Sequence, residues 1–407
     1  MAIQQGRDVA VWMKAQTTQG TEETAGSGAT KFLYKDGSPG FSPPQAALIE
    51  STVNLGDGLT ERGRRGSYNI PGTFNFEAAC GNHSIFYPIY FRNDWAAALT
   101  LDESTGAFSS ATLSVANTSE ITLSGGSWIT AGLRVGDAVK FTSGLDSGDL
   151  NKWFRIKSLT ATVLTTYETL TNVTGPVAAY DLTVPKKLLQ GTTEKILTME
   201  QYYQQADRSL VVHDVKGNSL NFTLGENTTL DVSASVLGAG YAYKATGSSP
   251  HFTGSAPTGD SLAFLDACFA INGSEVLSVT GFNIGLELNA SALAVANGCG
   301  TTPGKSPNIF QGNGKPTGQW SMALEDFTLL EAAAGETQID FIARFLDPNG
   351  TDILQLSVLN AIMTNEQISP LGQDGAMIQT FDLEIGRDKR GGAYDATSIK
   401  MFDSQAA

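Results

Sequence analysis

Three histidines are the first residues of this 407-residue chain to consider for acid–base or metal chemistry: His83, His213 and His251. Imidazole titrates near neutral pH and is the commonest metal ligand in proteins. No two of the three stand at the spacing of a metal-binding motif, and no His-Glu-x-x-His pattern is present. We therefore interpret them as surface or capping histidines, and the sequence predicts no metal site.

Two short motifs resemble ligand-binding loops without meeting their requirements. Residues 304–306, Gly-Lys-Ser, resemble the end of a phosphate-binding loop, but Cys299 occupies the position of the first glycine and Pro307 prevents the helix that should follow. Residues 347–352, Asp-Pro-Asn-Gly-Thr-Asp, have the wrong register for a calcium loop, and no glutamate closes it. We interpret this second motif as a turn, and we predict no catalytic residue and no cofactor.

Composition and charge argue against several other functions. The formal net charge is −15, so the chain has no basic footprint for gripping nucleic acid or an anionic membrane. Cys80, Cys268 and Cys299 are too few and too scattered for a disulfide framework, and we interpret them as buried thiols. The first residues lack an apolar signal segment, and no window reaches the ~18 apolar residues of a membrane span. We therefore expect residence in a reducing cytoplasm.

One charged cluster suggests a contact with another molecule. A hairpin is predicted over residues 51–78, and its glycine-rich tip carries two acidic side chains and three arginines. Such tips are most often simply solvated. In an acidic chain, however, exposed guanidinium groups can pair with carboxylates on another copy of the protein. The predicted contact residues are Asp57, Glu61, Arg62, Arg64 and Arg65.

Two long hairpins are the elements around which the rest of the chain is organised. In residues 210–238, and again in residues 353–386, apolar side chains alternate with polar ones on both sides of a turn. Each hairpin is preceded by an alternating strand and a compact apolar segment, in residues 72–94 and 318–348. The two copies are spaced unequally, which indicates an insertion in the first. The sequence therefore predicts a duplicated sheet domain.

The apolar segment of each copy is predicted to be helical. In the first copy, a short helix within residues 83–94 would be capped by Asn82 or Ser84, although Pro88 leaves a strand as the alternative. In the second copy, residues 335–348 predict a clearer helix with these side chains on one face: Ile339, Ile342, Phe345 and Leu346.

A further helix is predicted over residues 261–270. Asp260 would cap it, and Leu262, Leu265 and Phe269 would share one face. This helix would follow the best candidate for a linker between the copies, in residues 245–259.

These patterns divide the chain into three domains. Residues 1–104 and 185–245 would form the first sheet domain, residues 105–184 an inserted β domain, and residues 246–407 the second sheet domain with a C-terminal tail. Short alternating runs separated by glycine-rich turns indicate the strands of the insertion. The N-terminal arm, residues 1–45, is too poor in apolar side chains to fold alone, so it is either disordered or ordered by docking onto a neighbour, and we expect docking.

The order of these elements resembles the major tail tube proteins of long, non-contractile-tailed bacteriophages, the siphophages. The resemblance covers most of the chain and rests on residues 68–76, 210–238 and 353–386. The doubled form with an insertion is similar to tube proteins of larger flexible-tailed phages. It implies a mainly β fold with two tandem tail-tube β-sandwich or barrel domains, each flanked by a short helix. The insertion would be an immunoglobulin-like or small barrel β domain on the tube exterior.

The same resemblance implies a structural virion protein, and no enzyme, that polymerises as stacked rings into a conduit for genome ejection. Single-domain relatives form hexameric rings, so a doubled chain is expected to form a homotrimer, with a homohexamer as the alternative. The tape measure protein and viral DNA would occupy the lumen, and tail terminator and distal tail proteins would bind the ends. The chain would assemble in the host cytoplasm and reside in the virion tail. Arg62, Arg64 and Arg65 would contact the adjacent ring.

Charge supports this implication. A wall making even 6 to 10 contacts with phosphate groups would bind DNA strongly, with an affinity that shifts roughly 10³- to 10⁵-fold between low and moderate salt. A wall of carboxylates and neutral polar groups would instead let DNA slide. We therefore expect an inner wall that is not lined with lysine and arginine.

Two other classes of protein share parts of this pattern. A β-rich surface adhesin or layer protein has a similar composition, but it would need an export signal. A carbohydrate-active enzyme with a β fold would need converging carboxylates in a cleft, and nothing in the sequence selects such a pair.

Overall fold

The computed structural model describes residues 4–50, 62–108, 110–245, 247, 249–295, 304–370 and 375–406. The fold is mainly β, as predicted. The described residues contain two short α-helices, α1 (Pro88–Phe91) and α2 (Thr328–Ala334), and two 3₁₀ turns, η1 (Gly6–Asp8) and η2 (Phe264–Asp266). No helix in this part of the chain is long and apolar enough to cross a membrane.

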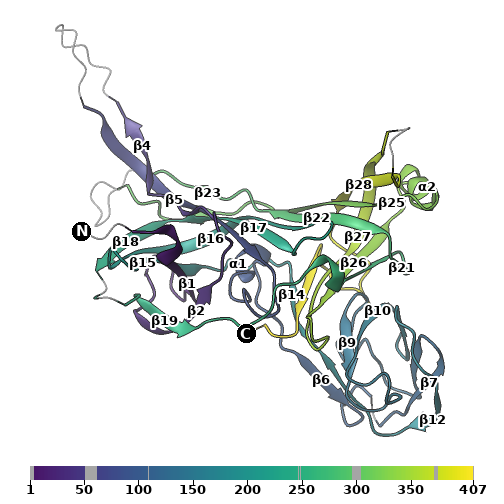
Figure 1. Cartoon of the computed structure of the whole chain (residues 1–407). Helices are drawn as coiled ribbons and strands as arrows, with labels where there is room; N and C mark the ends of the chain where they lie inside the picture. Colours follow the sequence, from purple (N-terminus) through teal and green to yellow (C-terminus); the bar gives the residue numbers. More distant parts are fainter. Residues whose placement is uncertain are drawn as a thin grey trace.

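One long antiparallel sheet runs through both halves of the chain and dominates the structure (Figure 1). Its strands are paired in an order that differs from their order in the sequence. From one edge to the other they are β4 (Gln45–Ile49), β5 (Arg64–Glu77), β17 (Asp231–Gly238), β16 (Arg208–Leu224), β22 (Val279–Glu287), β25 (Lys315–Ala323), β28 (Ile378–Ile385) and β27 (Ile353–Ile368). We refer to these strands as the long sheet.

Two strands pass from the long sheet into a second layer. The first part of β16 pairs with β15 and β18, and its second part pairs with β17 and β22. Likewise, the first part of β27 pairs with β26 and β29, and its second part pairs with β28. Both strands change layer near a bulge, where the register with the outer strand shifts. The two halves thus share one pattern of pairing.

The outer layer is built from shorter strands on each half. Those of the first half are β1 (Val9–Ala15), β2 (Gly26–Phe32), β15 (Leu197–Tyr203), β18 (Gly240–Ala245) and β19 (Phe252–Ser255). Those of the second half are β14 (Lys186–Leu189), β20 (Ala267–Ile271), β21 (Ser274–Val276), β26 (Ile339–Leu346) and β29 (Lys400–Asp403). Three shorter strands complete this part: β3 (Gly40–Phe41) pairs with β5, and β23 (Ser291–Ala292) pairs with β24 (Ile309–Phe310).

A continuous apolar core lies between the two layers. In the first half, the ring of Phe32 from the outer layer meets Phe74 and Phe76 of β5 edge-on, each at 5.2 Å between centroids. In the second half, the Trp320 ring lies 5.7 Å from Phe341 and 5.8 Å from Phe381. Each fully buried side chain of this kind contributes about 1.5–3 kcal/mol by leaving water. These aromatic rings pack the long sheet against the strands of the outer layer.

The N-terminal arm docks within its own chain. Strand β1 pairs along its whole length with β15, and Val11 and Met13 are buried in the core. Strand β2 pairs with β19, which lies in the segment predicted as a linker. The arm is therefore an integral part of the outer layer.

Residues 99–184 form a separate eight-stranded sheet with its own core, which includes Trp128 and Phe108 (Figure 1). We refer to it as the inserted sheet. Its strands are β6 (Leu99–Asp102), β7 (Leu113–Asn117), β8 (Glu120–Leu123), β9 (Ala138–Phe141), β10 (Trp153–Leu159), β11 (Val163–Thr166), β12 (Val173–Val177) and β13 (Asp181–Val184).

Buried ion pairs connect the inserted sheet to the second half of the chain. Glu168 Oε1 lies 2.7 Å from Arg155 Nε and 2.8 Å from Arg344 Nη1 of β26. The Arg155 and Arg344 side chains are 0% and 6% exposed. At a second point, Lys400 Nζ of β29 lies 3.3 Å from Asp137 Oδ1, and both side chains are buried. Apolar contacts join these pairs, so the inserted sheet packs on the outer layer, away from the long sheet.

Two predicted helices are wrong. Residues 339–346, predicted as a helix, form strand β26, and the helix of this half is α2, upstream of Gly335. Strand β26 is buried on both faces, with Phe341 and Phe345 in the main core and Ile342 against the inserted sheet. Such a strand is apolar nearly throughout, so its spacing is indistinguishable from that of a helix.

The helix predicted over residues 261–270 is also wrong, because this segment forms η2 followed by β20. The apolar pattern of this segment also resembles that of a helix because strand β20 is buried on both faces. Phe269 lies in the main core, and Ala270 packs against the inserted sheet. A helix does form within residues 83–94, but it starts at Pro88 with Tyr87 as its N-cap, in place of Asn82 or Ser84. Proline is well suited to the first turn, where its missing N–H is not needed.

Candidate assembly surface

One face of the long sheet is polar across its width. Residues opposite each other in antiparallel strands point to the same face, so the registers define rows of neighbouring side chains. One row reads Glu77, Asp231, Thr223, Asn283, Gln319, Asp382 and Thr364. The next reads Asn75, Ser233, Asn221, Gly285, Thr317, Glu384 and Ile362. We refer to this surface as the polar face; the opposite face packs on the core.

Hydrogen bonds between neighbouring strands order the polar face. The hydroxyl oxygens of Ser219 and Ser235 are 2.6 Å apart, linking β16 to β17. The Asn283 side chain on β22 donates to Thr223 on β16 at 3.3 Å. Gln319 Nε2 on β25 donates to Asp382 Oδ1 on β28 at 2.8 Å. These bonds span both halves and fix short side chains in place.

Carboxylates outnumber ammonium groups on the polar face. The acidic residues are Glu77, Asp231, Glu287, Asp382 and Glu384. Two lysines reach this surface: Lys35 Nζ is 2.8 Å from Asp231 Oδ1, and Lys315 Nζ is 4.0 Å from Glu384 Oε1. The hydrogen bond to Asp231 raises the pKa of Lys35 above its ordinary value. With five carboxylates and two lysines among the described residues, the face presents net negative charge, which repels phosphate groups.

The long sheet contains a join between the two halves of the chain. Strand β16 of the first half pairs with β22 of the second through six opposed residue pairs, from Ser219 with Glu287 to Leu224 with Phe282. At the sheet's two ends, β4 pairs only with β5, and residues 362–368 of β27 pair only with β28, within the described part of the chain. These edges carry unpaired backbone N–H and C=O groups, which favour pairing with another strand.

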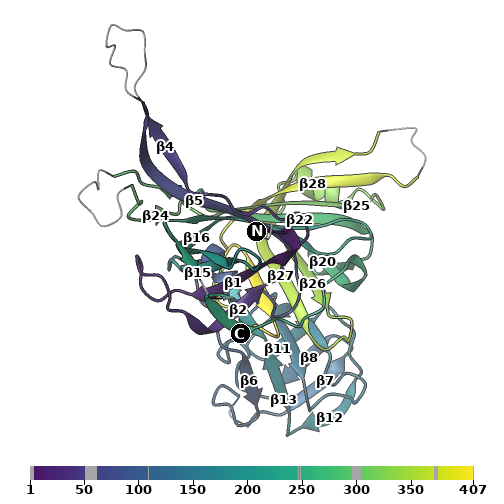
Figure 2. The same ribbon diagram turned by 60° about the vertical axis from the view of Figure 1, so that its left-hand side comes forward.

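The predicted contact loop lies at one of these edges. Asp57 and Glu61 are outside the described residues. Arg62, Arg64 and Arg65 are exposed, the last two at the start of β5. Arg64 is opposite Ile49, and Arg65 is opposite Leu48, on β4. The β4–β5 hairpin projects beyond the rest of the long sheet (Figure 2).

The prediction of surface or capping histidines is wrong for His83. This imidazole is 1% exposed and lies among the rings of Phe32 and Phe76, at 4.8 Å and 4.0 Å between centroids. Burial lowers the pKa of His83 to about 4, so the ring is neutral, and its Nε2 lies 2.9 Å from the Leu33 carbonyl oxygen. The residue is part of the core.

His213 belongs to a buried polar cluster at the bend of β16. Asp214 has a positive φ of 55° there and accepts hydrogen bonds from Gln16 Nε2 and Gly20 N, both at 2.7 Å. Its other oxygen lies 2.9 Å from His213 Nδ1. Burial alone would raise the pKa of Asp214, but the hydrogen bonds from His213, Gly20 and Gln16 lower it. The cluster anchors the N-terminal arm where β16 changes layer, and the sequence motifs did not indicate it.

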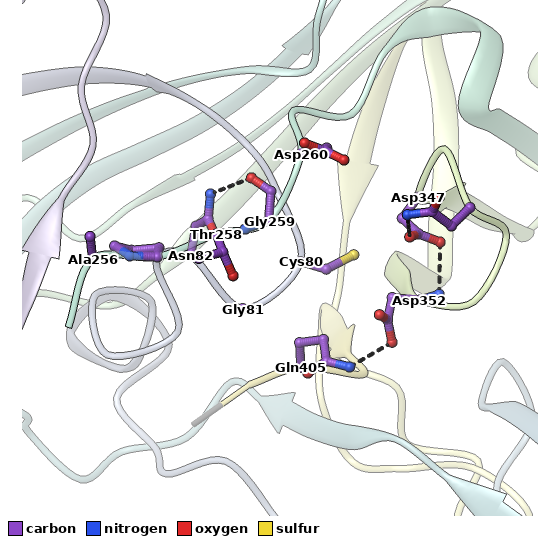
Figure 3. A pocket seen from close by; sticks show the side chains of 12 residues that line it. Cys80, Gly81, Asn82, Ala256, Thr258, Gly259, Asp260, Asp347, Asp352 and Gln405 are labelled. Carbon is purple, nitrogen blue, oxygen red and sulfur yellow. Dashed lines mark hydrogen bonds between the residues drawn. The ribbon is translucent and has the colours of Figure 1, made fainter.

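A cleft of about 420 Å³ is lined by residues from both halves of the chain, and Figure 3 shows its lining. Asp260, Asp347 and Asp352 border it, together with Cys80. Asp347 Oδ1 accepts the backbone N–H groups of Thr351 and Asp352, at 2.7 and 2.8 Å. Residues 347–352 therefore form the predicted turn, stabilised by its own aspartate.

The cysteines differ in their surroundings. Cys80 is buried, and burial raises the pKa of its thiol above the ordinary value. Cys268 is half-buried, so the prediction of a buried thiol is wrong there. Cys299 lies outside the described residues.

Among the comparisons with known proteins, the match to a family model is the informative one. A family model described as phage tail tube protein matches residues 6–385. No curated protein matches the chain significantly. Among solved structures, a chain of one described as "Cryo-EM structure of the anti-feeding prophage (AFP) baseplate, 6-fold symmetrised" matches at 10% sequence identity. The match covers 34% of this chain and 92% of that chain with a TM-score of 0.25, too low to bear on fold or function.

Proposed function

Because the chain belongs to the phage tail tube protein family, we propose that it polymerises as stacked rings into the tube of a long, non-contractile tail. The family places it among the structural proteins of the virion. In the proposed role the tube is the conduit through which the genome is ejected. The tape measure protein and viral DNA occupy its lumen, and tail terminator and distal tail proteins cap its ends.

The observation that carries this proposal is the join between β16 and β22. The strands β5, β17 and β16 are followed in the sheet by β22 and then by β25, β28 and β27, and the last three repeat the pairing order of the first three. Strand β22 covers one edge of β16, while the matching edge of β27 is open among the described residues. A second copy can cover it with the opposite end of its own long sheet, as β22 covers β16.

Closure of such a sheet favours three copies. Each chain supplies two equivalent units, so three chains give a pseudo-sixfold ring of six units. This number equals that of the hexameric rings of single-domain relatives. A closed ring also removes the exposed edges that would otherwise promote uncontrolled association. We therefore propose a homotrimer.

The polar face is the proposed lining of the lumen. It carries more carboxylates than lysines, and the remaining side chains of its two rows are neutral. Such a wall makes few attractive contacts with DNA phosphates, so DNA can slide along it. The inserted sheet packs on the opposite side of the outer layer, which supports its proposed place on the tube exterior.

Electron microscopy and light scattering of the purified chain, at low and high concentration, test the proposal. The expected result is hollow tubes or stacked rings, with rings of three times the chain mass. A compact monomer at every concentration would contradict it.

A variant at the open edge sharpens the test. The N–H of Ser369 donates to Ile378 on β28, so the N–H of Ile368 points toward the open edge. Ile368→Pro removes that donor and is expected to yield folded chains, by circular dichroism, that do not close into rings. Ile368→Ala is the matched control and should form rings. Normal rings from the proline variant would place the contact elsewhere.

A further inference from the structure

The end of the long sheet near α2 combines exposed apolar side chains with uncompensated acids. Residues 324–338 contain four acidic residues and no lysine or arginine. Glu325 and Asp326 are exposed, and no ion pair neutralises either one within the described residues. Beside them, Phe327 is 62% exposed and Leu277 94% exposed. We refer to Leu277, Glu325, Asp326 and Phe327 as the α2 edge.

These side chains belong to one region of the surface. The Ala323 N–H donates to the Ser278 carbonyl at 2.9 Å, which places Leu277 next to the end of β25. The Leu324 N–H donates to the Met377 carbonyl at 2.7 Å, which brings β28 to the same point. Large apolar side chains this exposed, beside acids, are typical of a surface that another protein covers.

The start of β5 carries two adjacent arginines, and exposed apolar side chains lie opposite them on β4. Leu48 is 62% exposed and Ile49 59% exposed. Arg65 and Arg64 lie directly opposite them, and both arginines are exposed. Arg64 and Arg65 form no ion pair within the described residues. We refer to these four residues as the hairpin edge.

The hairpin edge and the α2 edge lie at opposite ends of the long sheet (Figure 1). The registers show this directly. Glu77 and Asp231 are paired at the end near α2, whereas Ile70 and Gly238 are paired at the other end. Strand β5 continues from Ile70 for six further residues to Arg64, roughly 20 Å at about 3.3 Å per residue. The hairpin therefore projects away from the α2 edge.

We propose that the hairpin edge of one copy packs on the α2 edge of the next copy along the tube. The inference rests on the proposed function and adds the surface that accepts the arginines of the adjacent ring. Two different surfaces that are complementary in charge and both apolar form a head-to-tail contact, which repeats without closing and so builds a filament. Guanidinium groups would pair with Glu325 and Asp326 while Leu48 and Ile49 cover Phe327 and Leu277.

Charge reversal of each edge tests the contact. Arg64→Glu with Arg65→Glu, or Glu325→Arg with Asp326→Arg, places like charges together. Each pair is expected to leave rings intact but raise the concentration needed for tube growth on the order of 100-fold. Lys152→Glu, a reversal on the inserted sheet at a side chain that is 63% exposed, is the control and should grow tubes normally.

Recombining the reversals identifies the partner surfaces. The chain carrying all four substitutions, and an equal mixture of the two double variants, should both recover tubes, because acid again meets arginine at every contact. Normal tubes from both double variants would overturn the inference while leaving the proposed function standing. Intact rings with no recovery in the fourfold variant would also overturn it. Absence of rings from the unaltered chain would refute the proposed function itself.

Discussion

Replacing Glu168 with alanine tests what holds the inserted sheet on the second half of the chain. This carboxylate is shared by two buried guanidinium groups, with Oε1 at 2.7 Å from Arg155 Nε and 2.8 Å from Arg344 Nη1. Its other oxygen accepts the Arg155 backbone N–H at 2.8 Å. The substitution removes the carboxylate that both buried guanidinium groups share.

The magnitude follows from burial. Removing one partner of a buried ion pair costs about 3–5 kcal/mol, because the remaining charge stays desolvated. Arg155 also pairs with Glu275, whose side chain is 47% exposed. An ion pair with one exposed partner is worth about 0–1 kcal/mol, so Glu275→Ala should be nearly neutral. The same arginine therefore supplies a comparison between a largely buried carboxylate, which also pairs with Arg344, and a half-exposed one.

Hydrogen exchange with mass spectrometry, at concentrations below polymerisation, measures both variants locally. For Glu168→Ala we expect faster exchange in β10 and β26, corresponding to a loss of about 3 kcal/mol or more in local opening free energy. Glu168→Gln, which keeps the shape and one acceptor, should fall between this variant and the unaltered chain. Equal effects of Glu168→Ala and Glu275→Ala, or a cost below about 1 kcal/mol for the former, would refute the reasoning.

Three further predictions concern other parts of the molecule. Burial raises the pKa of Asp403 from 3.8 to about 6, so the folded state binds this proton more tightly than the unfolded state. The free energy of unfolding should therefore fall by about 3 kcal/mol as pH rises from about 4 to 6. Asp403→Asn should remove this fall, as measured by denaturation at a series of pH values. Replacing Asp382 and Glu384 with lysine gives the polar face a net positive charge, and assembled tubes should then retain DNA in a salt-dependent manner, unlike unaltered tubes, in a sedimentation assay. A short tag inserted after Ala178, an exposed residue between β12 and β13, should leave tube growth unchanged by microscopy; loss of tubes would argue against an exterior position for the inserted sheet.

Strand periodicity was the part of the fold most readable from the sequence. The hairpins of residues 210–238 and 353–386 are present as the pairs β16–β17 and β27–β28, because their alternation of polar and apolar residues needs only one buried face. Strand β26 was misread because it is buried on both sides, a condition that depends on the position of the inserted sheet. The hydrophobic pattern of a segment indicates how many of its faces are buried. It does not indicate which neighbouring element buries them.

The candidate assembly surface illustrates the same division. Ser233 and Ser235 are recognisable from the sequence as solvent-facing positions of a strand. That they continue a polar face extending to Asp382 on the far side of the sheet depends on the pairing of β16 with β22. Hydrogen bonds between distant strands decide such pairings, and no local property of either strand encodes them.

The sequence by itself determined the mainly β fold, the acidic character of the chain and the resemblance to tail tube proteins. These depend on composition and on periods of two residues, which are local. Only the tertiary structure decided that the two halves share one continuous sheet, that the arm docks within its own chain, and that Arg64 and Phe327 stand at opposite ends of that sheet. Those properties arise from strand neighbours far apart in sequence, where backbone pairing and burial select one arrangement among many with similar local patterns.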